Sequence, residues 1–398
     1  MKRLMAAVAG LYLVVLAVTP SAQQAAQGRE IFRFDTFGDE QLWTDVLQMH
    51  EVLASVPPSA ALKVGLKVDS EALPASIIND LKSGAVNLND PAVTRLLLSV
   101  NAVVGVMGKV SGNTIESIGI TCALCHSTVD DSVLPGVGRR LDGWANRTLN
   151  VGAILALSPT VQADSDLLAA VTSWKPGMYD PRLHAFDGDQ FIELNRSTEP
   201  VVIPPAYGLR LVHWETFTGD GTISYWNAYV GVTQMGGQGS FSDPRIKNLP
   251  PITQTPDMVT PKLPALLDYQ LSLQAPDPPR RSFDVVAAQR GRQLFNGPAR
   301  CDTCHMPPAF TDVLRRGDRS TPFLHAPSET GMSPVYASRT VNGRYRATPL
   351  RGIWSHPPYF HDGSAPTLLA VVNHYDNVLS LGLTAAQKAD LVEFLKSL

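Results

Sequence analysis

The chain has 398 residues and a formal net charge of −3, which is enough length for two or three globular domains. Its 33 Lys and Arg residues nearly balance its 36 Asp and Glu residues, so charge gives no reason to expect nucleic acid or an anionic membrane as a partner. Only four cysteines are present, and their spacing is the most informative feature of the sequence.

The N-terminus has the pattern of a secretory signal peptide. A basic start, Met1-Lys2-Arg3, precedes an apolar run over 4–18 and the small pair Ser21-Ala22. The run is short for a membrane span, which needs about 20 apolar residues. The pattern predicts a signal peptide over 1–22, a periplasmic bacterial protein and no stable membrane span after cleavage; a retained anchor is the alternative.

All four cysteines fall in two C-x-x-C-H motifs, at 122–126 and 301–305. This spacing is typical of haem c attachment, in which two thiols bind the vinyl groups of the haem and the adjacent imidazole becomes the proximal iron ligand. A zinc site would need four Cys or His ligands, and neither zinc nor a disulfide requires the adjacent His. The motifs predict two covalently bound haem c groups, held by Cys122, Cys125, His126, Cys301, Cys304 and His305.

An internal repeat surrounds these motifs. Gly28–Phe32 is similar to Gly291–Phe295, which lies just before the second motif. We expect a mainly α, loop-rich fold of two cytochrome c-like haem domains packed together. The predicted divisions are a first haem domain over 23–248 with a helical insertion at about 36–116, a Pro-rich crossover over 249–280, and a second haem domain over 281–398.

A helix expected after Pro366 carries two candidates for the distal ligand of the second iron. Tyr375 continues the apolar face of this helix, and His374 lies about 100° away around it. Ala228 and Tyr229 occupy the corresponding positions in the first repeat. If His374 is the ligand, the first iron has no equivalent; if Tyr375 is the ligand, Tyr229 could act in the same way.

The second repeat resembles a known family. Thr348–Gly363, which ends in Pro-Tyr-Phe-His-Asp-Gly, closely resembles bacterial dihaem cytochrome c peroxidases and MauG-type enzymes, and Phe32–Gly38 resembles the more remote dihaem rubber oxygenases. The resemblance implies helical haem domains, an electron route between the haems and an N-terminal haem that meets the oxidant. In MauG-type enzymes a Tyr is the distal ligand of the second haem, and that position matches Tyr375, with His374 adjacent. Some family members also hold calcium between domains.

Two departures from this family concern the first repeat. Peroxidases carry a Trp before the Asp-Gly pair, where this chain has Thr218-Gly219, and an active-site Glu about twenty residues later, where it has none. Glu moves a proton during O–O cleavage, which Gln cannot do. Gln234 and Gln238 remain as candidate catalytic residues that could hydrogen-bond an iron-bound ligand.

These observations predict an exported oxidoreductase in which the first haem reacts with peroxide or oxygen and the second relays electrons. Its expected electron donor is a small cytochrome, a cupredoxin or a small molecule, and no nucleic acid partner is expected. A non-catalytic electron-transfer cytochrome is the main alternative. An oxygenase acting on an apolar substrate is a further alternative, suggested by Phe32–Gly38.

Overall fold

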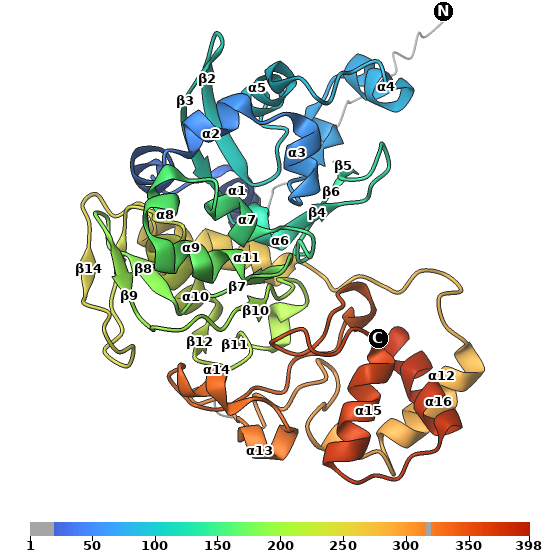
Figure 1. The fold of residues 1–398 in the computed structure, drawn as a ribbon. Helices are drawn as coiled ribbons and strands as arrows, with labels where there is room; N and C mark the ends of the chain where they lie inside the picture. Colours follow the sequence, from blue (N-terminus) through green and yellow to red (C-terminus); the bar gives the residue numbers. More distant parts are fainter. Residues whose placement is uncertain (1–19, 316–319) are drawn as a thin grey trace, which may run out of the picture.

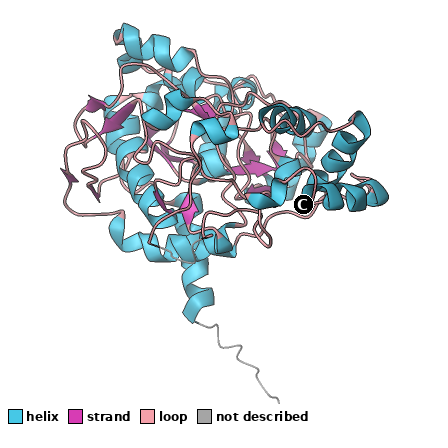
Figure 2. Cartoon of the chain, turned by 90° about the horizontal axis from the view of Figure 1, so that it is seen from below, coloured by secondary structure: helices cyan, strands magenta, loops and turns pink. Residues whose placement is uncertain are grey.

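The computed structural model of the chain describes residues 20–315 and 320–398 (Figure 1). Helices predominate, but the described strands form seven sheets of two strands each (Figure 2), so the fold is mixed rather than simply mainly α. Most of the predicted signal peptide lies outside the described residues. In the part that is described, no helix has both the length and the apolar character needed to cross a bilayer.

The first module, as we name residues 20–275, contains most of the described elements. Its helices are α1 (Pro20–Phe34), η1 (Gln41–Val46), α2 (Met49–Ser55), α3 (Pro58–Lys63), η2 (Ser70–Ala72), α4 (Ala75–Ser83), α5 (Pro91–Ser99), α6 (Ala123–His126), α7 (Val151–Leu155), α8 (Pro159–Ala163), α9 (Ser165–Thr172), η3 (Leu209–Leu211), α10 (Ile223–Tyr229), η4 (Val230–Gln234), η5 (Thr260–Lys262) and α11 (Leu263–Ser272).

The strands of the first module pair in small local sheets. The pairs are β1 (Val68–Asp69) with β5 (Val137–Gly138), β2 (Val106–Ser111) with β3 (Thr114–Ile120), β4 (Ser127–Val129) with β6 (Arg140–Asp142), β7 (Met178–Tyr179) with β10 (Val201–Val202), β8 (His184–Phe186) with β9 (Phe191–Glu193), β11 (Trp214–Glu215) with β12 (Gly221–Thr222), and β13 (Ser240–Phe241) with β14 (Ile252–Thr253).

The second module, residues 281–398, is drawn in orange to red in Figure 1 and has a core of its own. Its helices are α12 (Val285–Phe295), η6 (Cys301–Thr303), α13 (Pro327–Thr330), α14 (Pro334–Ser338), η7 (Ile353–Ser355), α15 (Leu368–Val378) and α16 (Ala385–Lys396).

The sequence repeat corresponds to a repeated helix crossing. In the first module α1 packs on α11, and a Cβ at Gly28 would lie 1.9 Å from the carbonyl oxygen of Ala265. In the second module α12 packs on α16, and a Cβ at Gly291 would lie 2.0 Å from the carbonyl oxygen of Asp390. Glycine is therefore needed at both crossings, because any side chain would force the helices apart.

An aromatic pair closes each of these crossings. The rings of Phe32 and Tyr269 meet edge to face with centroids 5.5 Å apart, and those of Phe295 and Phe394 do so at 5.0 Å. Such pairs contribute both buried area and a preferred geometry. The two modules thus share the same glycine and aromatic packing between their first and last helices.

The segment 249–280 differs from the expected extended crossover. It contains α11, whose Ala265, Leu266 and Tyr269 are buried against α1. Pro264 stands in the first turn of this helix, where its missing N–H costs nothing, so the proline starts the helix instead of preventing it. The crossover is therefore limited to the residues after α11.

The insertion at 36–116 is also less helical than expected. It begins with the π-helix η1 and continues through short helices, but it ends in the hairpin of β2 and β3. Gln48 adopts a left-handed conformation with φ of 54°, which separates η1 from α2. Gly112, with φ of 57°, forms the turn between the two strands. These local breaks divide one apolar stretch into several elements.

Buried polar contacts join the two modules. Asp180 pairs with Arg339 at 3.1 Å, and Glu215 pairs with Arg346 at 3.3 Å. The backbone N–H of Val202 donates to the carbonyl oxygen of His361 at 2.7 Å. These contacts bring α14 and the loop after it against β10 and β11.

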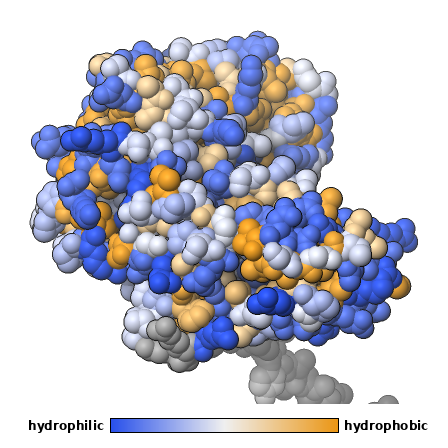
Figure 3. All heavy atoms as spheres, turned by 60° about the horizontal axis from the view of Figure 1, so that its bottom comes forward, coloured by the Kyte–Doolittle hydropathy of each residue, from blue (hydrophilic) through white to orange (hydrophobic). Residues whose placement is uncertain are grey.

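The surface seen in Figure 3 is mainly hydrophilic, with apolar residues in small groups. Among the exposed large apolar residues are Val285 and Val286 at the start of α12, and Leu369 on α15. Single exposed apolar residues of this kind are ordinary on a protein surface. A docking site for an electron donor stays a prediction.

Candidate functional site

A large apolar cavity lies beside the first C-x-x-C-H motif. Its volume is about 270 Å³, and Cys122, Cys125 and His126 are part of its wall. Apolar side chains from η1, α7, α9 and α10 form much of the rest, among them Leu42, Trp43, Val151, Val171, Ile223 and Trp226. A flat apolar cofactor attached at the two thiols would bury its faces here, so the cavity fits a haem.

The proximal histidine of this motif is oriented by the backbone. Nδ1 of His126 lies 3.1 Å from the carbonyl oxygen of Pro204, which can only accept a hydrogen bond. Nδ1 therefore carries the hydrogen, and Nε2 keeps a free lone pair for a metal. Burial lowers the pKa of His126 to about 4, so the imidazole is neutral, as a ligand must be.

The second motif repeats this arrangement. Nδ1 of His305 lies 2.9 Å from the carbonyl oxygen of Phe310, and burial lowers the pKa of this imidazole also. Burial raises the pKa of Cys122, Cys125 and Cys301 to about 12, so these thiols remain protonated. Both motifs thus have the residues and the histidine orientation that covalent haem attachment needs.

Two π-helices, η1 and η4, contribute residues to the wall of the first cavity, and η1 is hydrogen-bonded to the residues just after η4. Nε1 of Trp43 on η1 donates to the carbonyl oxygen of Met235, just after η4, at 2.9 Å, and Nε2 of Gln41 donates to that of Gly236 at 2.8 Å. π-Helical turns are rare and occur often at functional sites. The insertion therefore supplies a wall of the cavity, through Leu42, Trp43 and Leu47.

Gln234, one of the two predicted catalytic residues, lines this cavity. Its Oε1 accepts from the hydroxyl of Tyr179 at 2.6 Å, and its Nε2 donates to the carbonyl oxygen of His184 at 3.1 Å. Burial raises the pKa of Tyr179 well above its usual value, so its hydroxyl stays protonated and serves as a donor. The amide of Gln234 is held in a fixed orientation.

Gln238, the other predicted residue, lies elsewhere. Its Nε2 donates to the carbonyl oxygen of Thr255 at 2.9 Å, in a hydrogen bond that solvent reaches, and the side chain is not part of the cavity wall. The two glutamines are four residues apart, but η4 ends between them, so they do not share a helix face. The structure does not bring them together.

The two candidate distal residues on α15 point in different directions. Burial raises the pKa of Tyr375, and the electrostatic influence of the Cys304 and Cys301 thiols raises it further. Nε2 of His374 instead donates to the carbonyl oxygen of Thr330 at 2.8 Å. Of the two, Tyr375 is the side chain on which the thiols of the second motif have a resolved electrostatic influence, and His374 is engaged by the backbone.

Tyr229, the counterpart of Tyr375 in the first module, has a different environment. It is fully buried, its hydroxyl donates to the carbonyl oxygen of Pro181 at 2.5 Å, and the guanidinium of Arg182 lies 5.1 Å from its ring centroid. Pro181 belongs to the cavity wall and Tyr229 does not. The phenol therefore sits behind the lining and is engaged by the backbone.

A buried carboxyl group that the sequence reasoning missed also lines the first cavity. Glu215 pairs with Arg346 through Oε2, while its Oε1 is buried without a hydrogen-bond partner. Burial raises the pKa of Glu215, and Arg346 opposes that shift. Asp180 lines the cavity too, but Thr198, Glu199 and Arg339 all donate to it.

His184 lies on β8 and is part of the cavity wall. Its Nδ1 is buried without a hydrogen-bond partner, and burial lowers its pKa. Neither Glu215 nor His184 has a sequence signal beyond residue type. Both reach the cavity through two-residue or three-residue strands whose pairing the sequence does not specify.

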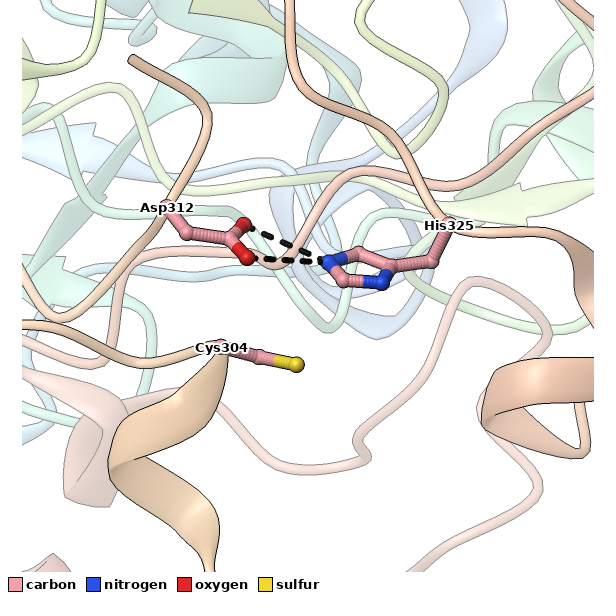
Figure 4. A group of neighbouring side chains, drawn as sticks. All are labelled: Cys304, Asp312 and His325. Atoms are coloured by element: carbon pink, nitrogen blue, oxygen red, sulfur yellow. Dashed lines mark hydrogen bonds and ion pairs between the residues drawn. The ribbon is translucent and has the colours of Figure 1, made fainter. Parts of the chain in front are cut away.

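Cys304, Asp312 and His325 form a cluster beside the second motif (Figure 4). Nε2 of His325 lies 3.1 Å from Oδ2 of Asp312, and this carboxylate, followed by Cys304, raises the pKa of His325 to about 10. Cys304 belongs to the haem-attachment motif, and a single carboxylate is a poor calcium site. We therefore read the cluster as an ion pair that braces the loop after the motif; calcium stays a prediction.

Comparisons with known proteins agree with these motifs. Residues 343–377 match the model of the RoxA-like, cytochrome c-like family. The chain is 28% identical over 153 residues to cytochrome-c peroxidase IdrP1 of Denitromonas iodatirespirans, which is 28% of this chain and 40% of that protein. It is 33% identical over 129 residues to the methylamine utilization protein MauG of Methylorubrum extorquens, which is 28% of this chain and 34% of that protein.

A third relative is hydrazine synthase subunit gamma of Kuenenia stuttgartiensis, 31% identical over 34% of this chain and 49% of that protein. The chain thus spans less than half the length of each of these relatives. A solved MauG-like protein associated with microbial copper homeostasis is 20% identical with a TM-score of 0.35, over 55% of this chain and 85% of that one. The sequence matches confirm the predicted relationship: the chain is similar to cytochrome c-like proteins, among them a bacterial cytochrome c peroxidase and MauG.

Proposed function

We propose that the protein is an exported dihaem oxidoreductase whose first haem reacts with peroxide or oxygen while the second stores and passes electrons. The observation that carries this proposal is the contrast between Tyr229 and Tyr375. In the second module the phenol has no backbone hydrogen bond among the described contacts and is under the electrostatic influence of the attachment thiols, whereas in the first it hydrogen-bonds the backbone behind the cavity wall. A haem with a weak or absent sixth ligand supplies an iron that binds and reduces small oxygen species.

The hydroxyl of Tyr229 is the reason for treating the first site as open. Its hydrogen bond to Pro181 is 2.5 Å long and its ring stacks under Arg182, so turning it toward the cavity would break both contacts. Tyr375 has no such backbone anchor among the described hydrogen bonds, and its neighbours are the rings of Phe360 and His374. The second site can therefore take the Tyr as its distal ligand, with His374 as the alternative.

Reduction of peroxide or oxygen consumes protons. Residues of the cavity wall would have to supply them. Glu215 is the carboxyl group there with an oxygen free of hydrogen bonds, and burial raises its pKa against the opposing charge of Arg346, which favours its acid form. Gln234 has a positioning role, because its side chain accepts a hydrogen bond from Tyr179 and fixes that part of the cavity wall. In this proposal Glu215 takes the role of the acid that the sequence was found to lack.

An aromatic contact path supports electron passage between the modules. Phe360 lies 6.0 Å from Tyr375, measured between ring centroids, and the next residue, His361, stacks on Tyr336 at 5.4 Å. Tyr336 belongs to the wall of the first cavity. Van der Waals contact of this kind gives electrons a short route between the two sites.

The test is turnover by the purified holoprotein. We expect oxidation of a reduced small cytochrome or a reduced dye that depends on added peroxide or oxygen. Gln234→Leu should lower this turnover because it frees Tyr179, whereas Gln238→Leu, four residues away and outside the cavity, should leave it unchanged.

The outcome also separates the alternatives. A non-catalytic electron-transfer cytochrome would exchange electrons with the donor and show no turnover with either oxidant. An oxygenase would take up oxygen only when an apolar organic substrate is added, without a donor. Either result would contradict the proposed reaction.

A further inference from the structure

Arg147 carries a guanidinium group at the junction of the two modules that has no acidic partner. Its Nε and Nη1 are buried without hydrogen-bond partners, and its Nη2 lies 3.4 Å from Nδ1 of His356 in the second module. Burial lowers the pKa of Arg147 to about 10, so the group is still charged at neutral pH. A cation is thus enclosed with only one weak contact to a neutral ring.

Other enclosed arginines of the described chain do have acidic partners. Four of them each have a carboxylate within 3.3 Å: Arg140 with Asp69, Arg182 with Asp220, Arg339 with Asp180 and Arg346 with Glu215. Burying an unpaired charge is costly, and proteins normally avoid it by pairing the charge. Arg147 therefore differs from these four arginines, because it is enclosed without a carboxylate partner.

The groups around Arg147 cannot replace a carboxylate. The hydroxyl of Tyr207 is engaged with Gly352 and Ser355, and that of Tyr359 donates to the carbonyl oxygen of Ile353. Burial, followed by the charge of Arg147, lowers the pKa of His356 to about 3, so its ring is neutral. The guanidinium fork is therefore free to bind an anion, and its planar geometry matches a carboxylate.

The backbone next to Arg147 fixes which carboxylate can reach it. The N–H of Asn146 donates to the carbonyl oxygen of Cys125 at 2.9 Å, and that of Gly143 donates to His126 at 2.8 Å. This segment therefore adjoins the edge of the first haem that carries the thioether bonds. The carboxylates of a haem lie at the opposite edge, so those of the first haem point away from Arg147.

The second module lies on the other side of the guanidinium. Tyr359 and Ile353 belong to the same buried cluster as Phe310, which orients His305, and Cys301 packs against that cluster. We propose that Arg147, a residue of the first module, binds a propionate carboxylate of the haem attached at Cys301 and Cys304. This inference rests on the proposed presence of two haems.

The proposed contact between Arg147 and a propionate would let the first module change the reduction potential of the second haem. A positive charge at a propionate offsets negative charge near the iron and so favours the reduced state. The haem that stores electrons would then be easier to reduce when the two modules are docked. A free carboxylate in solution is the other source of the same chemistry.

The test uses the holoprotein and three variants, with covalent haem counted by the pyridine haemochrome spectrum and each midpoint potential measured by spectroelectrochemical titration. Arg147→Gln should lower the potential of the second haem and leave that of the first unchanged. Arg147→Lys keeps the positive charge but loses the two parallel N–H donors of the guanidinium group, and should lower the potential of the second haem less. Arg290→Gln, which breaks an exposed ion pair with Asp390, is the matched control and should change neither potential.

Three results would overturn the inference. Two haems per chain with unchanged potentials in both Arg147 variants would mean that Arg147 binds no haem carboxylate. A potential of the unaltered protein that shifts with added formate or acetate would mean that a free carboxylate occupies the site. One haem per chain would overturn the two-haem proposal itself, which distinguishes its failure from that of Arg147.

Discussion

At the scale of single residues, the surroundings of the two C-x-x-C-H motifs, the candidate haem sites, differ. The phenol of Tyr375 is under the electrostatic influence of the second pair of thiols, whereas that of Tyr229 donates a hydrogen bond to the backbone of Pro181. Glu215 adds a buried carboxyl group to the first site. The two copies of the sequence repeat therefore form sites that differ in the orientation and contacts of a few side chains.

The role of Glu215 gives a kinetic prediction. Glu215→Gln should lower peroxide turnover by about 10²-fold, the lower range of general acid catalysis, because the amide cannot deliver a proton. Turnover of the unaltered protein should fall as pH rises through the raised pKa of Glu215, and the variant should lack that decline. Steady-state rates between pH 5 and 9 measure both effects.

Two further variants make this test specific. Glu215→Asp keeps a carboxyl group and should recover part of the turnover. Glu193→Gln, an exposed carboxylate on β9, should behave as the unaltered protein does. An unchanged rate and pH profile in Glu215→Gln would exclude Glu215 as the proton source.

At the scale of elements, close helix crossings and short irregular helices build the haem sites. α12 crosses α16 at Gly291, and α1 crosses α11 at Gly28. The π-helix η1 is anchored by Asp39, whose carboxyl oxygens accept the N–H of Ile120 and whose carbonyl oxygen accepts the N–H groups of Leu42 and Trp43. Each of these contacts has a consequence for stability.

Gly291→Ala should destabilise the second module. The added Cβ would lie 2.0 Å from the carbonyl oxygen of Asp390 and 2.8 Å from Cβ of Phe394, so α12 and α16 must separate. Overpacking of this kind typically costs about 1–3 kcal/mol. Gly297→Ala is the control, since that position is exposed at the end of the same helix; thermal unfolding followed by circular dichroism compares them. Equal midpoints would contradict the close crossing.

The buried carboxyl group of Asp39 should make the free energy of unfolding depend on pH. Burial raises its pKa well above the usual value, so the folded chain holds a proton there that the unfolded chain has lost. Stability should therefore fall as pH rises from about 4 to that raised pKa, by about 1.4 kcal/mol per pH unit. Asp39→Asn, which is neutral throughout, should lack this decline. Urea unfolding at pH 5 and pH 8 compares the two proteins; parallel changes would contradict the buried acid.

At the scale of the whole molecule, two modules with similar helix crossings meet through buried ion pairs. Tyr336 and His361 both belong to the second module and stack on each other, and Tyr336 also forms part of the wall of the first module's cavity. The arrangement therefore couples the second site to the first through side-chain contact.

Local patterns in the sequence predicted the parts of this molecule that depend on local spacing. The two C-x-x-C-H motifs, the repeat around Gly28 and Gly291, and the placement of Tyr375 and His374 on one helix follow from neighbouring residues. The sequence does not predict helix α11, because the Pro-rich composition of 249–280 favours an extended crossover, whereas Pro264 stands in the first turn of the helix. The cavity wall was missed because Trp43, His184 and Glu215 are brought together only by long-range packing.

The measurement that tests the central claim most directly is the low-temperature EPR spectrum of the purified ferric protein. An open first iron and a second iron capped by Tyr375 predict one high-spin and one low-spin signal. Tyr375→Phe should convert the low-spin signal to high-spin, and His374→Phe should leave it. Low-spin signals alone from the unaltered protein would mean that both irons are capped, and would contradict the account.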